Sequence, residues 1–290
     1  FLAKLVNGKA HFLSDKRYLN IMYRAVFDKK IDWVNPKTYN EKLQWLKLYD
    51  RRPEYTIMVD KYAAKEHVSK IIGSQYIIPT LGIWDRFDDI DFASLPDQFV
   101  LKCTHDSGGL VIVKDKSDFD MTAARKKIEA CLKKNYFWKG REWPYKNVHP
   151  RIIAEKYMVD ESNSELKDYK IYNFNGDPKF IEVDYDRFKS HKRNIYNIDW
   201  DYLDIMMQYP NDSNKYIPRP KALDIMLEAA KKLSKDIPHL RTDFYSIDDK
   251  IYFGEMTFYS SSGFMKITPD IWDERIGDWI ELPSKIPGGV

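Results

Sequence analysis

Two runs of aromatic and β-branched residues lie near the carboxyl end of the chain, at 240–247 and 251–259, on either side of the polar turn 248–250. This alternation predicts a β-hairpin. Successive side chains of a strand point to opposite faces. On that rule one face of the first strand carries Arg241, Asp243, Tyr245 and Ile247, and one face of the second carries Ile251, Phe253, Glu255 and Thr257.

The length of the turn determines which residues of the two strands lie opposite each other. A three-residue turn pairs Ile247 with Ile251, and the same register sets Asp243 opposite Glu255 and Arg241 opposite Thr257. Two carboxylates facing each other repel, whereas a cation between them reverses that interaction, and oxygen ligands suit Mg²⁺. The alternative is a solvated acidic face that Arg241 partly stabilises. A turn of even length favours this alternative, because it places the two acids on opposite faces.

The amino-terminal quarter has the apolar spacing of helices. We expect helices at 18–27, 41–49 and 56–71, with Thr38 or Asn40 capping the second and Gly73 ending the third. Lys61 lies on the third helix and, by itself, fits an ordinary surface lysine.

The rest of the chain alternates strand-forming runs with two amphipathic helices, at 122–135 and 220–236. Asn175-Gly176 is a strong hairpin signal between two of the runs. Irregular segments are expected at 137–149, 160–167 and 186–193. The expected strands are 77–84, 98–103, 110–113, 151–158, 168–174 and 177–183.

A glycine-rich turn, 104–109, joins two of these strands. The tip of such a turn exposes backbone N–H groups, which can bind an anion such as phosphate. Lys102 just before it would add a point charge. The turn does not fit the P-loop, which needs Gly-Lys-Ser/Thr at the start of a helix, and most Ser-Gly-Gly turns are only turns.

Composition narrows the class of protein. The chain has 290 residues, 43% hydrophobic and 31% charged, which is typical of a globular enzyme. A net charge of +3 is too small to indicate nucleic acid as a partner. Two cysteines, Cys103 and Cys131, give no disulfide framework and indicate a reducing compartment. No apolar run approaches the length of a membrane span. Because residue 1 is phenylalanine, an upstream anchor or signal stays open.

Five segments, in this order, carry a family resemblance. They are Tyr39–Gln44, Phe99–Gly109, Ile153–Tyr157, Asp168–Lys170 and Phe253–Tyr259. The chain resembles the ATP-grasp ligases, such as D-alanine–D-alanine ligase. It looks still more like the TupA-like ATP-grasp proteins of bacterial surface-polysaccharide clusters, from about Asn35 to Leu282.

The resemblance implies an α+β, ATP-grasp fold in which two lobes with largely antiparallel sheets clasp ATP. The expected parts are a helical amino-terminal region at 1–75, a first lobe at 76–157 and a second lobe with a metal site at 158–290.

The resemblance also implies roles around the nucleotide. Lys61 and Lys102 would bind phosphate, and Ser107, Gly108 and Gly109 would cover the β- and γ-phosphates through backbone N–H groups. Glu155, Lys156 and Tyr157 would form the adenine hinge, and Asp168 would bind the ribose. Lys170 is an additional cation that would touch phosphate.

Asp243 and Glu255 would hold Mg²⁺, with Glu255 bridging two ions, and Arg241 would face the charge developing on the transferred phosphoryl group. Thr257 stands where the family commonly has asparagine, so the coordination of a second metal differs. The amino-terminal region is short and helical, so the substrate-selecting part of classical members does not transfer.

These roles imply ATP- and Mg²⁺-dependent joining of a carboxylate to an amine through an acylphosphate. By family analogy the carboxylate belongs to an acidic sugar of a capsule or other surface polysaccharide, or its precursor. The protein would act in the cytoplasm, with peripheral contact at the inner face of the membrane left open. A basic set motivates the acidic acceptor: Arg51, Arg52, Arg187, Lys189, Lys192 and Arg193.

Three alternatives remain from sequence. A glycan kinase could use the same scaffold, and a glycosyltransferase could use Asp243 and Glu255 to hold the metal of a nucleotide-sugar. The latter lacks an early Asp-x-Asp between hydrophobic strands, since Asp89-Ile90-Asp91 follows a loop. A non-enzymatic glycan-binding module would use the many tyrosines and tryptophans.

Overall fold

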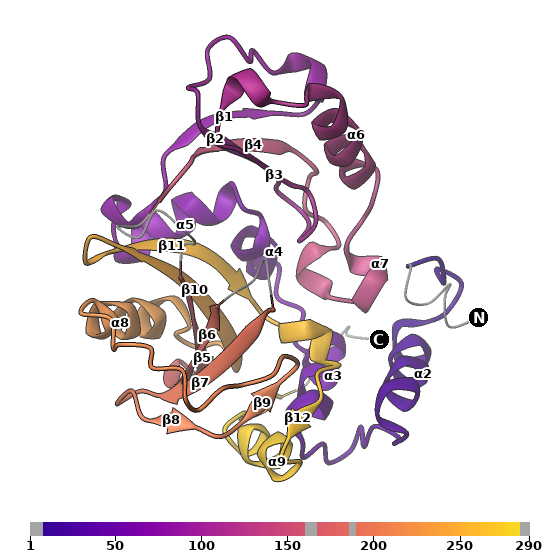
Figure 1. Cartoon of the computed structure of the whole chain (residues 1–290). Coiled ribbons are helices and arrows are strands. Elements are labelled where there is room, and N and C mark those ends of the chain that lie inside the picture. The colour runs from indigo at the N-terminus through magenta and orange to yellow at the C-terminus, as the bar shows by residue number, and fades with distance from the viewer. Residues whose placement is uncertain (1–7, 160–166, 186–189, 285–290) are drawn as a thin grey trace.

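The computed structural model describes residues 8–159, 167–185 and 190–284. Two antiparallel sheets dominate it, a four-stranded sheet ordered β1-β4-β2-β3 and a six-stranded sheet ordered β11-β10-β5-β6-β7-β8. Figure 1 shows the smaller sheet above the larger one, with α4 and α5 between them and β11 as the nearest edge of the larger sheet. A two-stranded sheet, β12-β9, lies beside the larger one. This mixed helix and antiparallel-sheet architecture is the expected α+β class.

The elements follow one another along the chain as helices first, then the smaller sheet, then the larger. The helices are α2 (Asp15–Phe27), α3 (Tyr39–Tyr49), α4 (Glu54–Val59), α5 (Ala63–Ile72), α6 (Met121–Leu132), α7 (Phe137–Gly140), α8 (Leu223–Leu233) and α9 (Ile271–Asp278). The strands of the smaller sheet are β1 (Thr80–Trp84), β2 (Phe99–Cys103), β3 (Leu110–Val113) and β4 (Ile152–Lys156). The remaining strands are β5 (Asp168–Phe174), β6 (Asp177–Tyr185), β7 (Lys192–Asn197), β8 (Tyr202–Leu203), β9 (Met206–Met207), β10 (His239–Ile247), β11 (Lys250–Thr257) and β12 (Ile267–Thr268).

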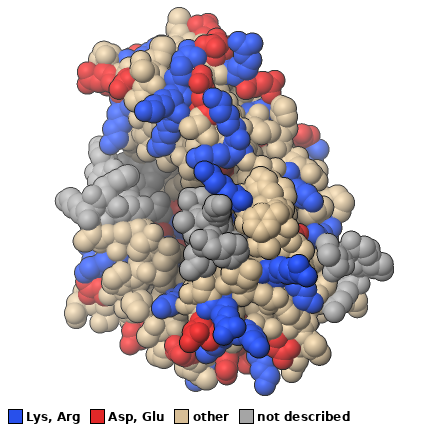
Figure 2. Space-filling model, turned by 90° about the vertical axis from the view of Figure 1, so that its right-hand side faces the viewer, with Lys and Arg blue, Asp and Glu red and all other residues tan. Residues whose placement is uncertain are grey.

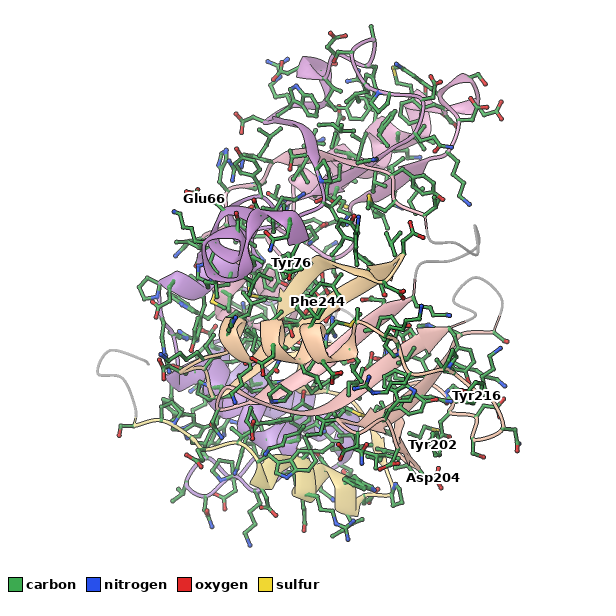
Figure 3. All side chains as sticks on the ribbon, turned by 90° about the vertical axis from the view of Figure 1, so that its left-hand side faces the viewer. Glu66, Tyr76, Tyr202, Asp204, Tyr216 and Phe244 are labelled. Carbon is green, nitrogen blue, oxygen red and sulfur yellow. The ribbon has the colours of Figure 1, made fainter. Side chains whose placement is uncertain are left out.

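Each sheet has its own hydrophobic core. The smaller sheet packs Phe99 and Leu101 of β2 against Ile128 of α6. The larger sheet shares one core with the amino-terminal helices, in which Tyr39 of α3 contacts Phe174 of β5, with ring centroids 6.4 Å apart. α8 covers one face of the larger sheet, and Phe244 of β10 is buried on that side (Figure 3). The opposite face packs Phe174 against Tyr39 at one end and carries the polar residues Arg241 and Asp243 further along β10.

The segment 39–44 fastens α3 to the end of the chain. Thr38 caps the helix in a capping box with Glu41. The Asn40 amide donates to the Met265 carbonyl oxygen at 2.9 Å, and Lys42 Nζ donates to the carbonyls of Gly277 and Ile280, both at 2.9 Å. This segment, one of the five that carried the resemblance, thus holds α3 against the carboxyl-terminal elements.

The helix expected at 56–71 is wrong as one element, because it breaks into α4 and α5 at Asp60. The Asp60 carboxylate accepts hydrogen bonds from the backbone N–H groups of Tyr62, at 2.9 Å, and Ala63, at 3.3 Å. An aspartate that satisfies the first free N–H groups of a helix favours a helix start. Lys61 therefore lies in a turn, where its backbone N–H donates to the Thr104 carbonyl oxygen at 3.0 Å.

Other boundaries also differ from expectation. The charged loop expected at 186–193 lies partly outside the described residues, but its end forms β7, which the sequence pattern did not predict. The loop expected at 160–167 lies almost wholly outside the described residues. The irregular 137–149 segment contains α7 and packs inward, with Phe137 and Arg141 buried. Among the described helices, none combines the length and apolarity that crossing a membrane requires.

Candidate functional site

The β10–β11 hairpin places Asp243 opposite Glu255 and Arg241 opposite Thr257, as predicted. The expected turn is nevertheless wrong. Ile247 pairs with Lys250, so the turn has only two residues, Asp248 and Asp249, both with positive φ.

A β-bulge restores the register. Phe244 pairs with Phe253, and the next residue towards the amino terminus, Asp243, pairs with Glu255, which leaves Gly254 as the extra residue. The prediction that Phe253 and Glu255 share a face is therefore wrong. Phe253 faces the core, and the bulge turns Glu255 to the polar face beside Asp243.

Arg241 binds both acids at once. Its Nε and Nη2 atoms are 2.7 Å from the two oxygens of Asp243, and Nη2 is also 2.9 Å from Oε1 of Glu255. The hydroxyl of Thr257 donates to the same Glu255 oxygen at 3.2 Å. One nitrogen atom thus lies within hydrogen-bonding distance of both carboxylates, so a single cation can reach both. The oxygen donors suit Mg²⁺.

The two acids differ in their electrostatic surroundings. Asp243 is buried, with a side chain 3% exposed, whereas the Glu255 side chain is 40% exposed. Burial raises the pKa of Asp243 to about 7, although Arg241 and Lys170 favour its charged form. Burial also opposes ionisation of Glu255, but Arg241 and Lys61 outweigh it and lower its pKa. Glu255 is therefore the charged, accessible member of the pair.

Lys170 lies next to Asp243 on the adjoining strand β5, and the two residues are register partners. Its ammonium group is bound to Asp168 and lies 3.4 Å from Asp184 Oδ2 and 3.8 Å from Asp243 Oδ2. The structure thus brings Asp168 and Lys170 together with the acid pair. In this arrangement Lys170 is the counter-ion of three carboxylates.

Glu155 of β4 lies between two lysines. Lys65 Nζ is 2.5 Å from its Oε1 and Lys102 Nζ is 2.6 Å from its Oε2. Burial opposes ionisation of Glu155, but Lys102 and Lys65 reverse the effect and lower its pKa. Its side chain therefore points at Lys102, one of the two lysines expected near phosphate, and at Lys65. Lys156 ends the strand and Tyr157 follows it, so the strand leads into the expected hinge.

Lys65 is a site residue that sequence reasoning missed. It lies on α5 four residues after Lys61, and its Nζ also donates to the Ile78 carbonyl oxygen at 2.7 Å. The spacing of four residues was a signal, because residues four apart on a helix share a face, and both lysines line the same cleft.

A narrow cleft joins these groups across the two sheets. It is lined by Lys61, Lys65, Ile77, Ile78, Lys102, Glu155, Phe253 and Gly254. The lining combines three lysines and Glu155 with apolar residues from β11 and from the segment before β1. The lysines give the cleft the positive charge that an anionic ligand would need.

The glycine-rich turn binds its own aspartate. Asp106 Oδ1 accepts hydrogen bonds from the N–H groups of Gly108, at 3.2 Å, and Gly109, at 3.0 Å. Lys61 Nζ donates to the Asp106 carbonyl oxygen. Two of the N–H groups predicted to cover phosphate are therefore occupied by a carboxylate. Phosphate binding by the turn stays a prediction, and it would require Asp106 to release these two donors.

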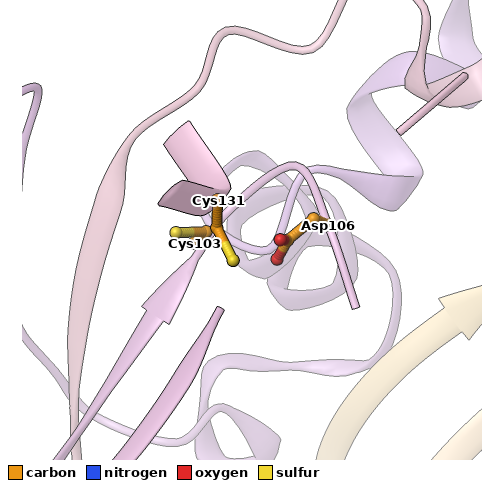
Figure 4. Close-up of side chains that lie close together, drawn as sticks. All are labelled: Cys103, Asp106 and Cys131. Carbon is orange, nitrogen blue, oxygen red and sulfur yellow. The ribbon is translucent and has the colours of Figure 1, made fainter. Parts of the chain in front are cut away.

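Two buried thiols lie beneath this turn, beside Asp106 (Figure 4). One ligand atom from each of Cys103, Asp106 and Cys131 lies within 4.8 Å of the others. Burial first, and then the Asp106 charge, raises the pKa of Cys103 far above its usual range. Cys103 Sγ is also the reason Gly109 has no room for a side chain, since an added Cβ would lie 2.5 Å from it.

The basic set expected to receive an acidic substrate is engaged elsewhere. Arg187 and Lys189 lie outside the described residues. Each of the other four is paired: Arg51 with Asp15, Arg52 with Asp50, Lys192 with Asp212, and Arg193 with Glu182 and Asp184. These four cations stabilise the fold and are not free to bind an acceptor.

Two antiparallel sheets that enclose a lysine-lined cleft, with a carboxylate pair on a hairpin of the second sheet, define an ATP-grasp protein. The chain belongs to the TupA-like ATP-grasp family, whose model matches residues 41–281. This membership confirms the resemblance, the fold class and ATP as a cofactor, whereas Mg²⁺ stays a prediction. The individual site residues and the boundaries at 75/76 and 157/158 stay predictions.

Among curated proteins, none matches the chain. Solved structures similar to it include D-alanine–D-alanine ligase from Helicobacter pylori, at 17% identity over 69% of this chain and 54% of that one, with a TM-score of 0.37. The Bacillus anthracis enzyme complexed with ATP is 16% identical over 70% and 54%, with a TM-score of 0.40. A RimK domain protein from Sphaerobacter thermophilus is 12% identical over 78% and 69%, with a TM-score of 0.43. The chain spans just over half the length of the two D-alanine–D-alanine ligases.

Proposed function

We propose that this protein is an ATP- and Mg²⁺-dependent carboxylate–amine ligase that attaches an amino compound to an acidic sugar of a bacterial surface polysaccharide or its precursor. One observation carries the ligase part: the lysine-lined cleft and the Asp243–Glu255 pair meet at Gly254, the bulge residue that lines the cleft and sets the acid register. The surface-polysaccharide part rests on family analogy, and the reaction would take place in the cytoplasm.

The chemistry follows from charge. A carboxylate and a triphosphate repel each other, so the cations around the phosphates must neutralise them before the carboxylate can attack the γ-phosphorus. Lys61, Lys65 and Lys102 reach the cleft and would do this from one side. Asp243, Glu255 and the Thr257 hydroxyl would hold Mg²⁺, which supplies further neutralising charge when bound.

The carboxylate oxygen bonds to the γ-phosphorus, and the bond to the β-γ bridging oxygen breaks, giving an acylphosphate and ADP. The amine nitrogen then attacks the carbonyl carbon, inorganic phosphate leaves, and the amine loses a proton. Arg241, held beside both acids, would face the charge that develops on the transferred group. Positioning and electrostatic stabilisation supply most of the rate.

A coupled assay tests this proposal. ADP release should require Mg²⁺, a uronate and an amine together, and phosphate should appear in equal amount. ADP release with a neutral sugar and no amine would contradict the ligase proposal and indicate a kinase on the same scaffold. A thermal shift with UDP-sugars but none with ATP would indicate a glycosyltransferase.

A further inference from the structure

Six exposed lysines form a strip along α6, α7 and the segment after them. We call them the lysine strip: Lys126, Lys127, Lys133, Lys134, Lys139 and Lys146. Within the described residues none of the six lies within salt-bridge distance of a carboxylate. This separates them from the paired cations Arg51, Arg52, Lys192 and Arg193.

Four of these lysines lie on the last turns of α6 and directly after it. Lys126 and Lys127 belong to the helix, Lys133 is its C-cap residue, and Lys134 follows. The neighbouring acid does not neutralise them, because Glu129 is paired with Arg125 at 3.2 Å. Figure 2 shows Lys and Arg side chains gathered over the upper half of this face. Like charges so close repel one another, and a bound anion relieves that repulsion.

The strip continues across the connection after α6. The Asn135 amide donates to the Lys146 carbonyl oxygen at 2.9 Å, which brings the far end of the connection back to the end of α6. Lys139 Nζ lies 5.9 Å from the centre of the Tyr136 ring, and Lys146 Nζ lies 5.3 Å from the Phe137 ring. Lysines therefore alternate with aromatic rings over this part of the strip.

Tyr136 connects the strip to the catalytic cleft. The Ser107 hydroxyl, on the glycine-rich turn, donates to the Tyr136 hydroxyl at 3.2 Å. Tyr136 also contacts Tyr145, with ring centroids 4.8 Å apart. A ligand lying along the lysine strip would therefore reach the turn that faces the nucleotide.

We propose that the lysine strip binds a linear polyanion that carries carboxylates, namely the acceptor chain of the ligation, and leads it to the glycine-rich turn. This rests on the proposed function, since the strip is assigned to the acceptor of that reaction. The strip's unpaired charges match a chain with regularly spaced carboxylates. Nucleic acid matches the charge too, but its phosphodiesters offer no carboxylate to activate.

An anionic membrane fits the strip less well than a single chain does. In the upper part of the same face, acidic side chains stand beside the basic ones (Figure 2). A flat anionic surface would meet those acids as well, whereas one extended chain can follow the lysines and avoid them.

The test measures binding of fluorescein-labelled polygalacturonate, a linear uronate polymer, to the full chain without ATP, with dextran as the neutral polymer. The strip variant replaces Lys126, Lys127, Lys133 and Lys134 with glutamine. A matched control replaces four exposed lysines of the second sheet region, Lys231, Lys232, Lys235 and Lys250, which are likewise absent from the salt bridges of the described residues. Both variants lose four charges.

We expect polygalacturonate to bind the wild type and the control, to bind the strip variant at least about tenfold more weakly, and to lose affinity as salt rises. Equal binding by the strip and control variants overturns the proposal. So does failure of the wild type to bind the polymer, or strip-dependent binding of phosphatidylglycerol vesicles or poly(U) alone. The thermal shift with Mg²⁺-ATP should be the same in all three proteins. That shift reports the nucleotide site separately, so failure of the strip and failure of the proposed function can be told apart.

Discussion

Arg241 reaches across the β10–β11 ladder to Glu255, with its Nη2 atom 2.9 Å from Oε1 of the glutamate. The same nitrogen is 2.7 Å from Oδ2 of Asp243. Two carboxylates this close would repel each other, and the guanidinium keeps them together before any metal arrives. A metal bound to Asp243 or to Oε1 of Glu255 would share those oxygens with Arg241. The arginine and the metal would then lie side by side.

Replacing Glu255 with glutamine tests the metal role. The amide keeps the size of the side chain and removes its charge, so we expect Mg²⁺-dependent ADP release to fall by about 10²–10³, which corresponds to roughly 2.7–4 kcal/mol of barrier. The thermal unfolding temperature should change little, because the Glu255 side chain is 40% exposed.

Glu281→Gln is the control for this substitution, since Glu281 is exposed and outside the cleft. Full activity of Glu255→Gln at saturating Mg²⁺ would show that Glu255 is not a ligand of the metal.

The sequence predicted that Asp243 and Glu255 lie opposite each other, but it did not predict the turn and the bulge that bring them together. The alternating aromatic and β-branched residues predict both strands, and a three-residue turn gives the right pairing for these acids. The protein instead uses a two-residue turn, which alone would separate the acids, and corrects it with a bulge at Gly254. The shorter turn shifts the pairing by one residue, and the bulge at Gly254 shifts it back, so Glu255 has its predicted partner. Phe253 lies between the turn and the bulge, keeps the shifted pairing, and therefore faces the core.

Contacts between distant segments were beyond the sequence pattern. The pairing of Lys65 with Glu155 joins residues 90 positions apart, at 2.5 Å, and depends on how α5 packs against β4, which local propensity does not predict. The same holds for Arg193, expected in a solvated loop and found buried between Glu182 and Asp184. Periodicity locates elements, whereas the partners of a charged side chain depend on how those elements pack.

Lys65→Ala should weaken nucleotide binding. The change removes one of the two cations that hold Glu155 and one of three lysines in the cleft. We expect ATP affinity to fall about tenfold and the free energy of unfolding to fall by about 1–3 kcal/mol, since a buried charge loses a partner. Isothermal titration with a non-hydrolysable ATP analogue and urea unfolding measure these effects.

Lys70→Ala is the matched control, because Lys70 lies on the same helix and its salt bridge with Glu66 is exposed. Its loss should change the stability little, because solvent screens an exposed ion pair, and should leave ATP binding intact. Equal effects of the two substitutions would exclude a special role for Lys65.

Gly109→Ala should disturb the glycine-rich turn from below. The new Cβ would lie 2.5 Å from Cys103 Sγ and 3.2 Å from Asp106 Oδ1. Overpacking of this kind typically costs about 1–3 kcal/mol, and the displaced turn should bind ATP more weakly. Gly108→Ala is the control, since its Cβ would meet only Asp106 Oδ2 at 3.9 Å.

The double variant Gly109→Ala with Cys103→Ala tests the cause. Removing the sulfur should restore part of the stability and ATP affinity lost in Gly109→Ala, measured by urea unfolding and titration of both single variants and the pair. If the losses of stability and ATP affinity in the two single variants add up to the loss in the double variant, the Cys103 sulfur is not the reason that position 109 requires glycine.

His239 should make the protein sensitive to acid. The imidazole is buried, and its Nδ1 is 3.0 Å from the Asn173 carbonyl oxygen while its Nε2 is 3.0 Å from the Tyr39 hydroxyl. The carbonyl can only accept, so Nδ1 carries the proton and Nε2 accepts from Tyr39. Burial lowers the pKa of His239 from 6.5 to about 3. Between these values the unfolded chain binds a proton that the folded protein does not.

The sign follows from that difference in bound protons: His239 makes stability rise with pH from about 3 to 6.5, by at most roughly 1.4 kcal/mol per pH unit. His239→Gln should therefore unfold more easily at neutral pH yet lose less stability on acidification through this window. Urea unfolding at half-unit pH steps measures the slope, with the exposed His149→Gln as control. An unchanged slope in His239→Gln would mean that other buried groups cause the acid sensitivity.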